Sequence, residues 1–492
     1  MSTLVALARA QAYVDGRAQP IATVRHLHVH DRPFVLIPLA MAGEANAPLA
    51  AMVGTAAAVP RLLVVEQPRN RDERFAFAAG LAGHLVPYLE SFAGETEAVA
   101  VDRGRDVRYR FVDAPQVWVP NPGGVDFLRL FGRSTRFRRV DGDHPVPASV
   151  PLLGRWLTFL TGSAEVPGSA LLPTTVQALM MHWATGQSGA EDNHLGSLLA
   201  WIESGAAAAR EAERGPVAGP STDPDFDNHV LAPLIANSDP GLRKVLHELL
   251  LPTWAAMWRA LDLLRGLPPG DRVGSRWDGD RDAYSAYVQH LAEDGAPQPR
   301  RDGAVAAAAR LQRLENAAAR YAVQRAFDDP LVMAEYRLSG AAFGGVVTLA
   351  DPDRVDDTGK RPVLRPRIMV ATTETVRVEA GASLTSPARP AQKAKVISVT
   401  ATATGYDVLL ELSGGMGRKL VAEPGSVPLV GETVLLTTLS DAYRPGAAFP
   451  EPADTPWTHG GPPPLSTDSS SDSSSDSSSD SSTDSSPDSD DE

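Results

Sequence analysis

The chain contains no cysteine, which excludes disulfides, thiolate zinc sites, iron–sulfur clusters and cysteine nucleophiles. Lysine is also scarce, because five lysines stand against 41 arginines. Aromatic residues make up only 6% of the sequence, which favours helices packed through small side chains over an aromatic-rich β-sandwich. Since arginine is the usual cation of this chain, an arginine-rich segment carries less information here than it would elsewhere.

The sequence lacks a long hydrophobic run. The longest, Phe34 to Ala42, is interrupted by Pro38 and is about half of the ~20 apolar residues that a membrane span needs. The first residues show no basic stretch followed by an apolar stretch and a small-residue cleavage pattern. The composition of the whole sequence, 43% hydrophobic and 22% charged, is ordinary for a globular protein. We therefore expect a soluble cytoplasmic protein without a membrane partner.

The negative charge is concentrated at the C-terminal end. Residues 466–492 hold nine acidic and no basic residues, so the formal charge of −14 falls to −5 for the rest of the chain. This Ser/Asp-rich stretch has almost no apolar side chain to bury, and its like charges repel one another. We expect a disordered acidic tail over 466–492, preceded by a Pro/Gly linker over 446–465.

A β-rich block precedes the linker. Short β-branched segments separated by Gly and Pro turns occur at Phe343–Leu349, Arg367–Thr372, Lys395–Thr400, Tyr406–Leu412 and Glu432–Thr437. Some of them are continuous apolar runs, as expected when little of the sheet is exposed. The block predicts a small closed β-barrel domain over 339–445, of an OB-like or SH3-like type.

The rest of the chain predicts two further domains, so the expected fold class is α+β and multidomain. Residues 149–338 are expected to be mainly helical, because apolar residues recur at helical spacing over Gly241–Leu267 and an Ala-rich stretch follows Asp302. Residues 1–148 mix both types and predict an α/β unit. Its expected elements are strands at Ile21–His30, Phe34–Leu39 and Arg61–Glu66, a helix over Arg71–Phe92, and a hairpin from Val107–Val112 and Gln116–Val119.

The segment HLHVH is the candidate metal site. In a strand, His26, His28 and His30 would all point to one side. Neutral imidazoles are good zinc ligands, and an alternating histidine pair on a strand occurs in metal-dependent hydrolases. No second ligand motif accompanies the segment. The competing interpretation is a polar, solvent-facing side of a half-buried sheet, and the cofactor prediction is accordingly none, with a divalent metal as the alternative.

Other catalytic motifs are absent from the sequence. There is no phosphate-binding loop, dinucleotide fingerprint, kinase motif set or zinc-protease helix. The acid-rich loops that begin at Asp223 and Asp278 space their carboxylates as a calcium loop does, but lack its sixth-position glycine and twelfth-position glutamate. We therefore lean towards a protein without enzymatic activity.

The segment GGVDFLRLFGRSTRFRRV, residues 123–140, is the candidate nucleic-acid site. It gathers arginines around aromatic side chains: Arg129, Arg133, Arg136, Phe137, Arg138 and Arg139. Guanidinium groups match the geometry of phosphate, and Phe137 could stack on a base. The competing interpretation is that these arginines pair with neighbouring acids such as Asp126 and Asp141.

The sequence leaves three functions open. The preferred one is a non-enzymatic intracellular accessory or adaptor protein with protein partners, placed in a nucleic-acid-handling complex by its arginine-rich segment, its barrel and its acidic tail. The second is a metal-dependent hydrolase centred on the HLHVH segment. The third is a structural interaction protein without a ligand.

Overall fold

The computed structural model describes residues 2–42, 47–101, 104–215, 221–359, 361–441, 448–450 and 454. The predicted acidic tail and most of the predicted linker lie outside these residues. Met1–Arg301 and Arg310–Gly446 belong to one compact unit, and the second unit consists of Asp302–Ala309 with Ala447–Glu492. The fold is mixed helix and strand, and it includes a closed barrel in the C-terminal region.

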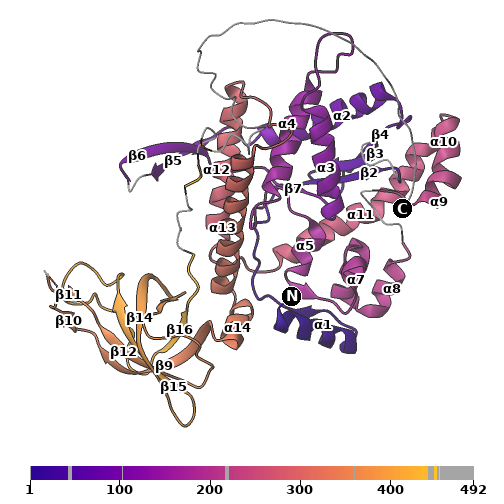
Figure 1. Ribbon diagram of the computed structural model, residues 1–492. Helices are drawn as coiled ribbons and strands as arrows, with labels where there is room; N and C mark the ends of the chain where they lie inside the picture. Colours follow the sequence, from indigo (N-terminus) through magenta and orange to yellow (C-terminus); the bar gives the residue numbers. More distant parts are fainter. Residues whose placement is uncertain are drawn as a thin grey trace, which may run out of the picture. The chain divides into compact units, whose positions relative to one another are not determined.

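A four-stranded sheet forms the centre of the N-terminal region (Figure 1). Its strand order is β4 (Arg61–Val64), β3 (Pro48–Gly54), β2 (Phe34–Ala40) and β7 (Val117–Trp118). The β2–β3 and β3–β4 pairs are antiparallel, whereas β2 and β7 are parallel. Every residue of β2 is buried, which is expected of a strand that is covered on both faces of its sheet.

The two faces of the sheet belong to two different hydrophobic cores. Alternate β2 residues divide between them: Leu36 lies in one core, and Val35 and Ile37 lie in the other. The first core includes side chains of α2 (Arg71–Glu90), α3 (Pro122–Thr135), α4 (Ser149–Ser163) and α12 (Val273–Ala292). The second core includes side chains of α5 (Thr175–Met180), α7 (Leu195–Ser204) and α11 (Gly241–Arg265).

Shorter elements surround these layers. A two-stranded sheet pairs β1 (Gln19–Pro20) with β8 (Trp183–Ala184), and another pairs β5 (Thr96–Val101) with β6 (Asp106–Phe111). The remaining helices before the barrel are α1 (Thr3–Asp15), α6 (Gly189–Asp192), α8 (Ala206–Ala212), α9 (Pro224–Phe226), the π-helix η2 (Asp227–Leu231), α10 (Ala232–Ala236), α13 (Ala304–Asp328) and α14 (Pro330–Ser339).

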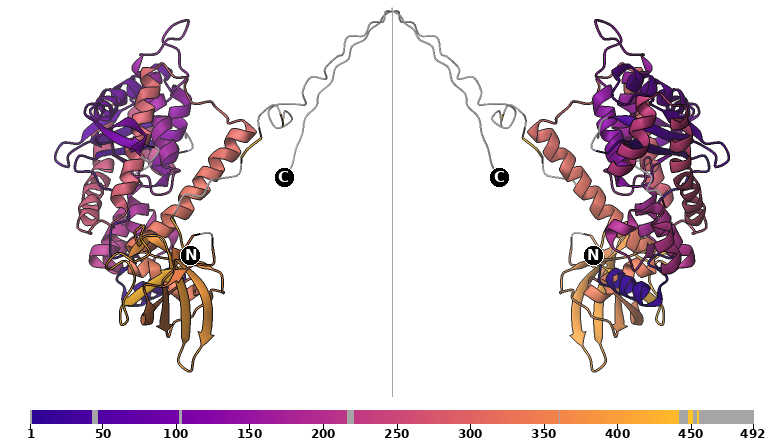
Figure 2. Two further views of the ribbon diagram at one scale, coloured as in Figure 1. Left: turned by 90° about the vertical axis from the view of Figure 1, so that its left-hand side faces the viewer. Right: turned by 90° about the vertical axis from the view of Figure 1, so that its right-hand side faces the viewer.

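The C-terminal region contains a closed antiparallel barrel of six strands. The barrel is drawn in orange in Figures 1 and 2. Around the barrel the strands follow the order β12 (Arg367–Thr372), β15 (Tyr406–Ser413), β14 (Arg389–Ala401), β13 (Ser383–Ser386), β16 (Thr433–Thr437) and β9 (Ala342–Asp351). Burial alternates along β12 and β15, so every second side chain fills the interior. A small hairpin pairs β10 (Val355–Asp356) with β11 (Val363–Leu364).

The structure confirms the predicted mixture of helix and strand, the barrel and most long elements. The expected helices at Arg71–Phe92 and Gly241–Leu267 correspond to α2 and α11. The strand predicted at Ile21–His30 is wrong, because this stretch is irregular apart from one bridge between Arg25 and Pro269. The predicted hairpin is also wrong, since β6 pairs with β5 and the Val117–Trp118 strand pairs with β2. Among the described residues, no helix combines the length and apolar character that a membrane crossing requires.

Candidate nucleic-acid interface and buried histidine cluster

The predicted arginine-rich segment lies at the C-terminal end of α3. Asn121 caps the start of this helix by accepting a hydrogen bond from the Gly124 backbone, and Pro122 occupies the first turn, where its missing N–H costs nothing. The end of α3 packs closely on α4, because a Cβ at Gly154 would lie 2.3 Å from the backbone nitrogen of Arg136. Only glycine at position 154 leaves room for the backbone at the C-terminal end of α3 to pack this closely on α4.

Arg136 belongs to the interior rather than to the surface. It is 3% exposed, and its Nε and Nη2 atoms donate hydrogen bonds of 2.9 Å to the carbonyls of Gln298 and Pro299. Burial lowers the pKa of the Arg136 guanidinium, and the positive charges of Arg133 and Arg300 lower it further. Arg136 thus holds the segment before Arg300 against the end of α3.

This contact assembles a set of exposed cations around one aromatic ring, which we call the basic surface. Phe137 is 38% exposed, and the guanidinium carbons of Arg136 and Arg300 lie 4.9 Å and 5.3 Å from its ring centre. The basic surface consists of Arg133, Phe137, Arg138, Arg139, Arg300 and Arg301, all of them exposed.

Most of the exposed arginines in the basic surface have no carboxylate partner in the part of the chain that the structure describes. Arg139 pairs with Asp141 at 3.1 Å, as the competing interpretation expects. Arg138 instead donates to the Ser134 carbonyl and stacks on Phe75, 5.3 Å from the ring centre. Within the described residues, Arg133, Arg138, Arg300 and Arg301 form no ion pair with a carboxylate. The surface therefore keeps an excess of positive charge in a chain that is acidic as a whole.

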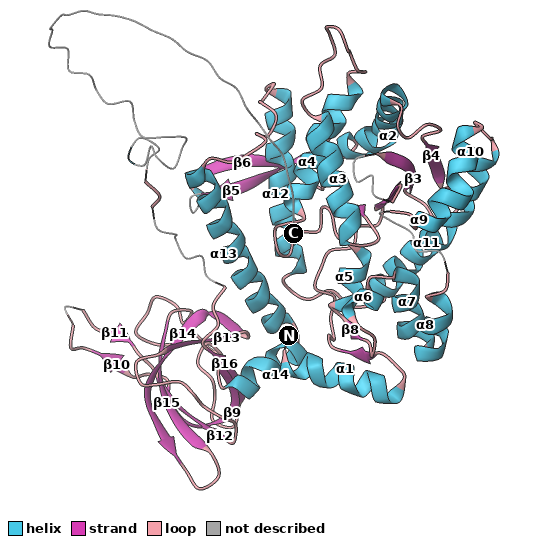
Figure 3. Ribbon diagram, turned by 45° about the vertical axis from the view of Figure 1, so that its right-hand side comes forward, coloured by secondary structure: helices cyan, strands magenta, loops and turns pink. Residues whose placement is uncertain are grey.

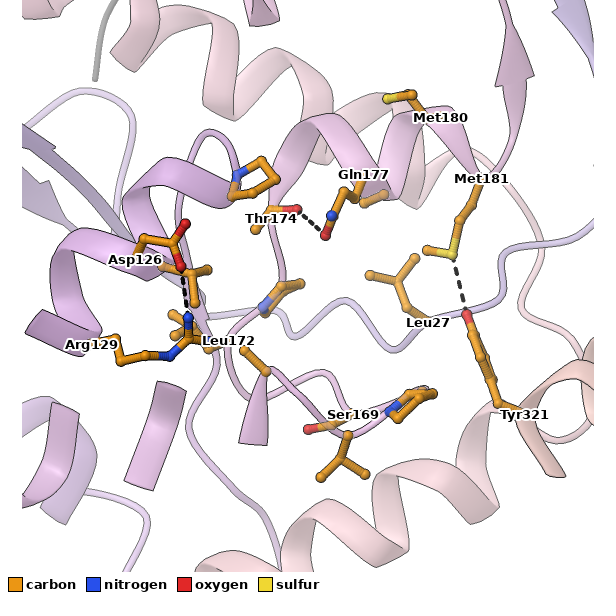
Figure 4. A pocket seen from close by; sticks show the side chains of 18 residues that line it. Leu27, Asp126, Arg129, Ser169, Leu172, Thr174, Gln177, Met180, Met181 and Tyr321 are labelled. Atoms are coloured by element: carbon orange, nitrogen blue, oxygen red, sulfur yellow. Dashed lines mark hydrogen bonds and ion pairs between the residues drawn. The ribbon is translucent and has the colours of Figure 1, made fainter. Parts of the chain in front are cut away.

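Arg129 lies apart from the basic surface, in the wall of a pocket of about 540 Å³ (Figure 4). Its guanidinium pairs with Asp126 at 2.7 Å and with Glu165 at 3.3 Å. In the same pocket, Thr174 donates to the side-chain oxygen of Gln177. The pocket is otherwise mainly apolar, with Leu27, Val125, Leu172, Met180 and Met181 in its wall. Because Arg129 is already neutralised there, we exclude it from the proposed anion site.

The histidines of HLHVH are packed inside the protein. His26 is fully buried, and its ring stacks at 5.6 Å on the ring of His182. His28 stacks on Trp277 at 4.1 Å, while His30 Nε2 lies 2.7 Å from an oxygen of Asp113. The expectation of a polar, solvent-facing side is wrong, because His26 and His30 are buried. The segment is also not a strand, because its backbone bonds to side chains instead of to a neighbouring strand. The N–H of His30, for example, donates to the side-chain oxygen of Gln116.

The environment of the histidines favours neutral imidazoles. Burial lowers the pKa of His28 and of His182 to about 4, and it also lowers the pKa of His26. His182 accepts a hydrogen bond from the His26 backbone at Nε2, while its Nδ1 lies 2.6 Å from the Ala178 carbonyl. Within the described part of the chain, no three His, Asp or Glu side chains come together in a way that could hold a metal ion.

A buried carboxyl group lies behind the pocket wall. Asp280 accepts hydrogen bonds of 2.7 Å from the Ser169 hydroxyl and from the Ala170 backbone. Burial nevertheless raises the pKa of Asp280 to about 7, since the two hydrogen bonds and the charge of Arg276 offset only part of the desolvation. These bonds fix the loop that enters the pocket, so we assign Asp280 a structural role.

Sequence reasoning missed the second half of the basic surface. Arg300 and Arg301 come from a loop more than 160 positions along the chain from Arg133. Phe75, on which Arg138 stacks, comes from α2. The adjacent pair Arg300-Arg301 was the only sequence signal, and in an arginine-rich chain it does not stand out. Comparison with known proteins adds no functional information, since the chain matches no family model, no curated protein and no solved structure.

Proposed function

We propose that the protein is a non-enzymatic cytoplasmic accessory or adaptor protein that binds single-stranded nucleic acid through the basic surface. The observation that carries the proposal is the convergence of two distant segments, 133–139 and 300–301, on the exposed ring of Phe137. An exposed aromatic ring among guanidinium groups suits a strand whose bases stack and whose phosphates pair with arginine, largely without regard to sequence.

The barrel forms the second part of the proposal. We assign it to the OB-like or SH3-like class of small barrels, several of which bind oligonucleotides or peptides. It has six strands in its ring, whereas an OB-fold has five, so it would be an enlarged version. The same proposal includes domain limits at 148, 338 and 445. It also includes protein partners for the acidic tail.

The proposal is tested by fluorescence anisotropy of a labelled single-stranded oligonucleotide over a salt series. The logarithm of the binding constant should fall linearly with the logarithm of the salt concentration, with a slope of about 0.7 for each phosphate contact. Replacing both Arg133 and Arg300 with glutamine should reduce that slope by roughly one to two. Neither side chain pairs with a carboxylate of the described chain, so the fold should tolerate both changes.

Two further variants separate stacking from charge. Phe137→Leu should weaken binding by about 1–3 kcal/mol without changing the salt slope, because it removes a stacking platform and no charge. The matched control replaces the exposed Arg313 and Arg320 of α13 with glutamine, and it should leave the slope unchanged. Absence of binding at low salt, or an equal loss in the control, would show that the basic surface has another role.

A further inference from the structure

A groove separates α1 from α14, a helix that lies more than 300 positions further along the chain. The two helices lie next to each other (Figures 1 and 3). Glu335 of α14 binds the start of α1. Its carboxylate accepts hydrogen bonds from the Ser2 hydroxyl at 2.6 Å and from the backbone of Thr3 and Leu4 at 2.9 Å and 3.2 Å. A negative charge at a helix N-terminus is favourable, so this contact fixes one end of the groove.

The groove has a volume of about 540 Å³, which is in the usual range for a small-molecule site of roughly 300–1,000 Å³. The strand-and-loop segment Gln19–Ile21 also lines it. Its walls are mostly apolar: Leu4, Val5, Leu7, Ala8, Pro20, Ile21, Leu331, Val332 and Tyr336. Such a wall suits a hydrocarbon chain, because the apolar surface on both sides leaves contact with water when the chain enters.

One cation of the groove, Arg325, has no ionic partner among the residues that the structure describes. Arg325, near the end of α13, is half-buried, and its Nε atom is inaccessible to solvent and makes no hydrogen bond. Its guanidinium carbon lies 5.8 Å from the ring centre of Tyr321. Within the described residues no carboxylate pairs with Arg325. A partly desolvated guanidinium of this kind favours an anionic partner.

The nearby carboxylates are already committed to other groups. Asp328 pairs with Arg272 at 3.1 Å and with Arg276 at 3.6 Å. Asp329 accepts hydrogen bonds from the Thr23 backbone at 2.7 Å and from the Leu331 backbone at 2.9 Å, and lies beside His26. Glu335 is likewise held by the start of α1. Among the described residues, none of these three carboxylates forms an ion pair with Arg325.

We propose that the groove between α1 and α14 binds a fatty carboxylate, with its carboxylate on Arg325 and its hydrocarbon chain between the two helices. The combination of apolar walls and a single unpaired guanidinium carries this inference. It is independent of the nucleic-acid proposal, since the groove and the basic surface share no residue. A polyanion would leave its other charges against apolar walls, which makes nucleic acid a poor occupant.

The test is calorimetric titration of the full-length protein with dodecanoate, and with dodecanol as the uncharged analogue. The wild-type protein should bind dodecanoate with a Kd well below about 1 mM, and Arg325→Gln should weaken that binding on the order of tenfold. The same variant should leave dodecanol binding almost unchanged. Ala8→Phe, which fills the groove, should weaken binding of both ligands.

The matched control is Arg320→Gln, which removes an exposed arginine from the same helix and should affect neither ligand. Circular dichroism checks that each variant is folded. The proposal is overturned if folded wild-type protein binds neither ligand, or if Arg320→Gln weakens dodecanoate binding as much as Arg325→Gln does. It is equally overturned if Ala8→Phe has no effect, because the ligand would then lie elsewhere.

Discussion

At the scale of single residues, burial shifts the pKa of several ionisable side chains and so determines whether they carry a charge. His28 is the clearest case, because its Nε2 atom is buried without a hydrogen-bond partner and its ring stacks on Trp277. Burial lowers its pKa from 6.5 to about 4. The unfolded chain therefore takes up a proton at this residue below pH 6.5 whereas the folded chain does not, and stability falls as the pH drops towards 4.

We predict that His28→Phe removes this part of the acid sensitivity. The wild-type protein should lose up to about 3 kcal/mol more unfolding free energy than the variant on going from roughly pH 7 to pH 4. The phenyl ring keeps the stacking on Trp277. Asp280 is present in both proteins, so its opposing contribution cancels in the comparison. Urea unfolding at a series of pH values measures the effect.

The control for that experiment is His84→Phe, which changes an exposed histidine of α2. It should leave the pH dependence of the unfolding free energy as it is in the wild type. Parallel pH curves for His28→Phe and the wild type would mean that burial does not suppress protonation of His28.

At the scale of elements, the placement of the basic surface depends on how closely α3 approaches α4. Gly132 and Gly154 supply the contact, since a Cβ at either would come within 3.1 Å of the facing helix. The approach directs Arg136 inward to the carbonyls of Gln298 and Pro299. Helix packing therefore decides which of the adjacent side chains Arg136 and Phe137 faces solvent.

We predict opposite effects for two glycines of α4. Gly154→Ala should destabilise the protein by about 1–3 kcal/mol or more, because its Cβ would meet the backbone of Arg136. Gly162→Ala, where nothing lies within 4 Å of the added Cβ, should stabilise by up to about 1 kcal/mol through better helix propensity. Thermal and denaturant unfolding of both variants provide the measurement. Equal effects would mean that the two helices do not pack at this distance.

At the scale of the whole molecule, charge is distributed unevenly along the chain. The last 27 residues, 466–492, contain nine acidic and no basic residues, while positive charge gathers at the basic surface. A tethered polyanion competes with a nucleic acid for cations in the same molecule, and salt screens this competition.

We predict that deleting residues 466–492 leaves the thermal midpoint almost unchanged and increases oligonucleotide affinity at low salt. The first result follows because the composition offers almost no apolar surface for packing, and the second because a competing polyanion is gone. The control is a tail of equal length with every acid replaced by its amide, which should behave like the deletion. A drop of several degrees in the midpoint, or unchanged affinity, would contradict the prediction.

Elements with long, regular patterns could be predicted from the sequence alone. Helical spacing predicted α2 and α11, and β-branched segments between turns predicted the barrel strands, because these patterns depend on which face of an element is buried. It missed β3 and β13, of which β13 is only Ser383–Ser386. A strand covered on both faces, such as β3, shows no alternation that would distinguish it from other apolar stretches.

Tertiary contacts determine where each candidate site residue lies and which groups it contacts. The HLHVH spacing predicts three histidines on one side of a strand, yet the segment runs irregularly through the interior and gives each ring a different partner. The arginines of the arginine-rich segment lie in three different environments. Arg136 is buried, Arg129 forms ion pairs in the pocket wall, and the others are exposed. Contacts with residues far away in the chain, such as Pro299 and Glu165, cause this division. Local patterns do not encode such contacts, because they arise only when distant elements pack together.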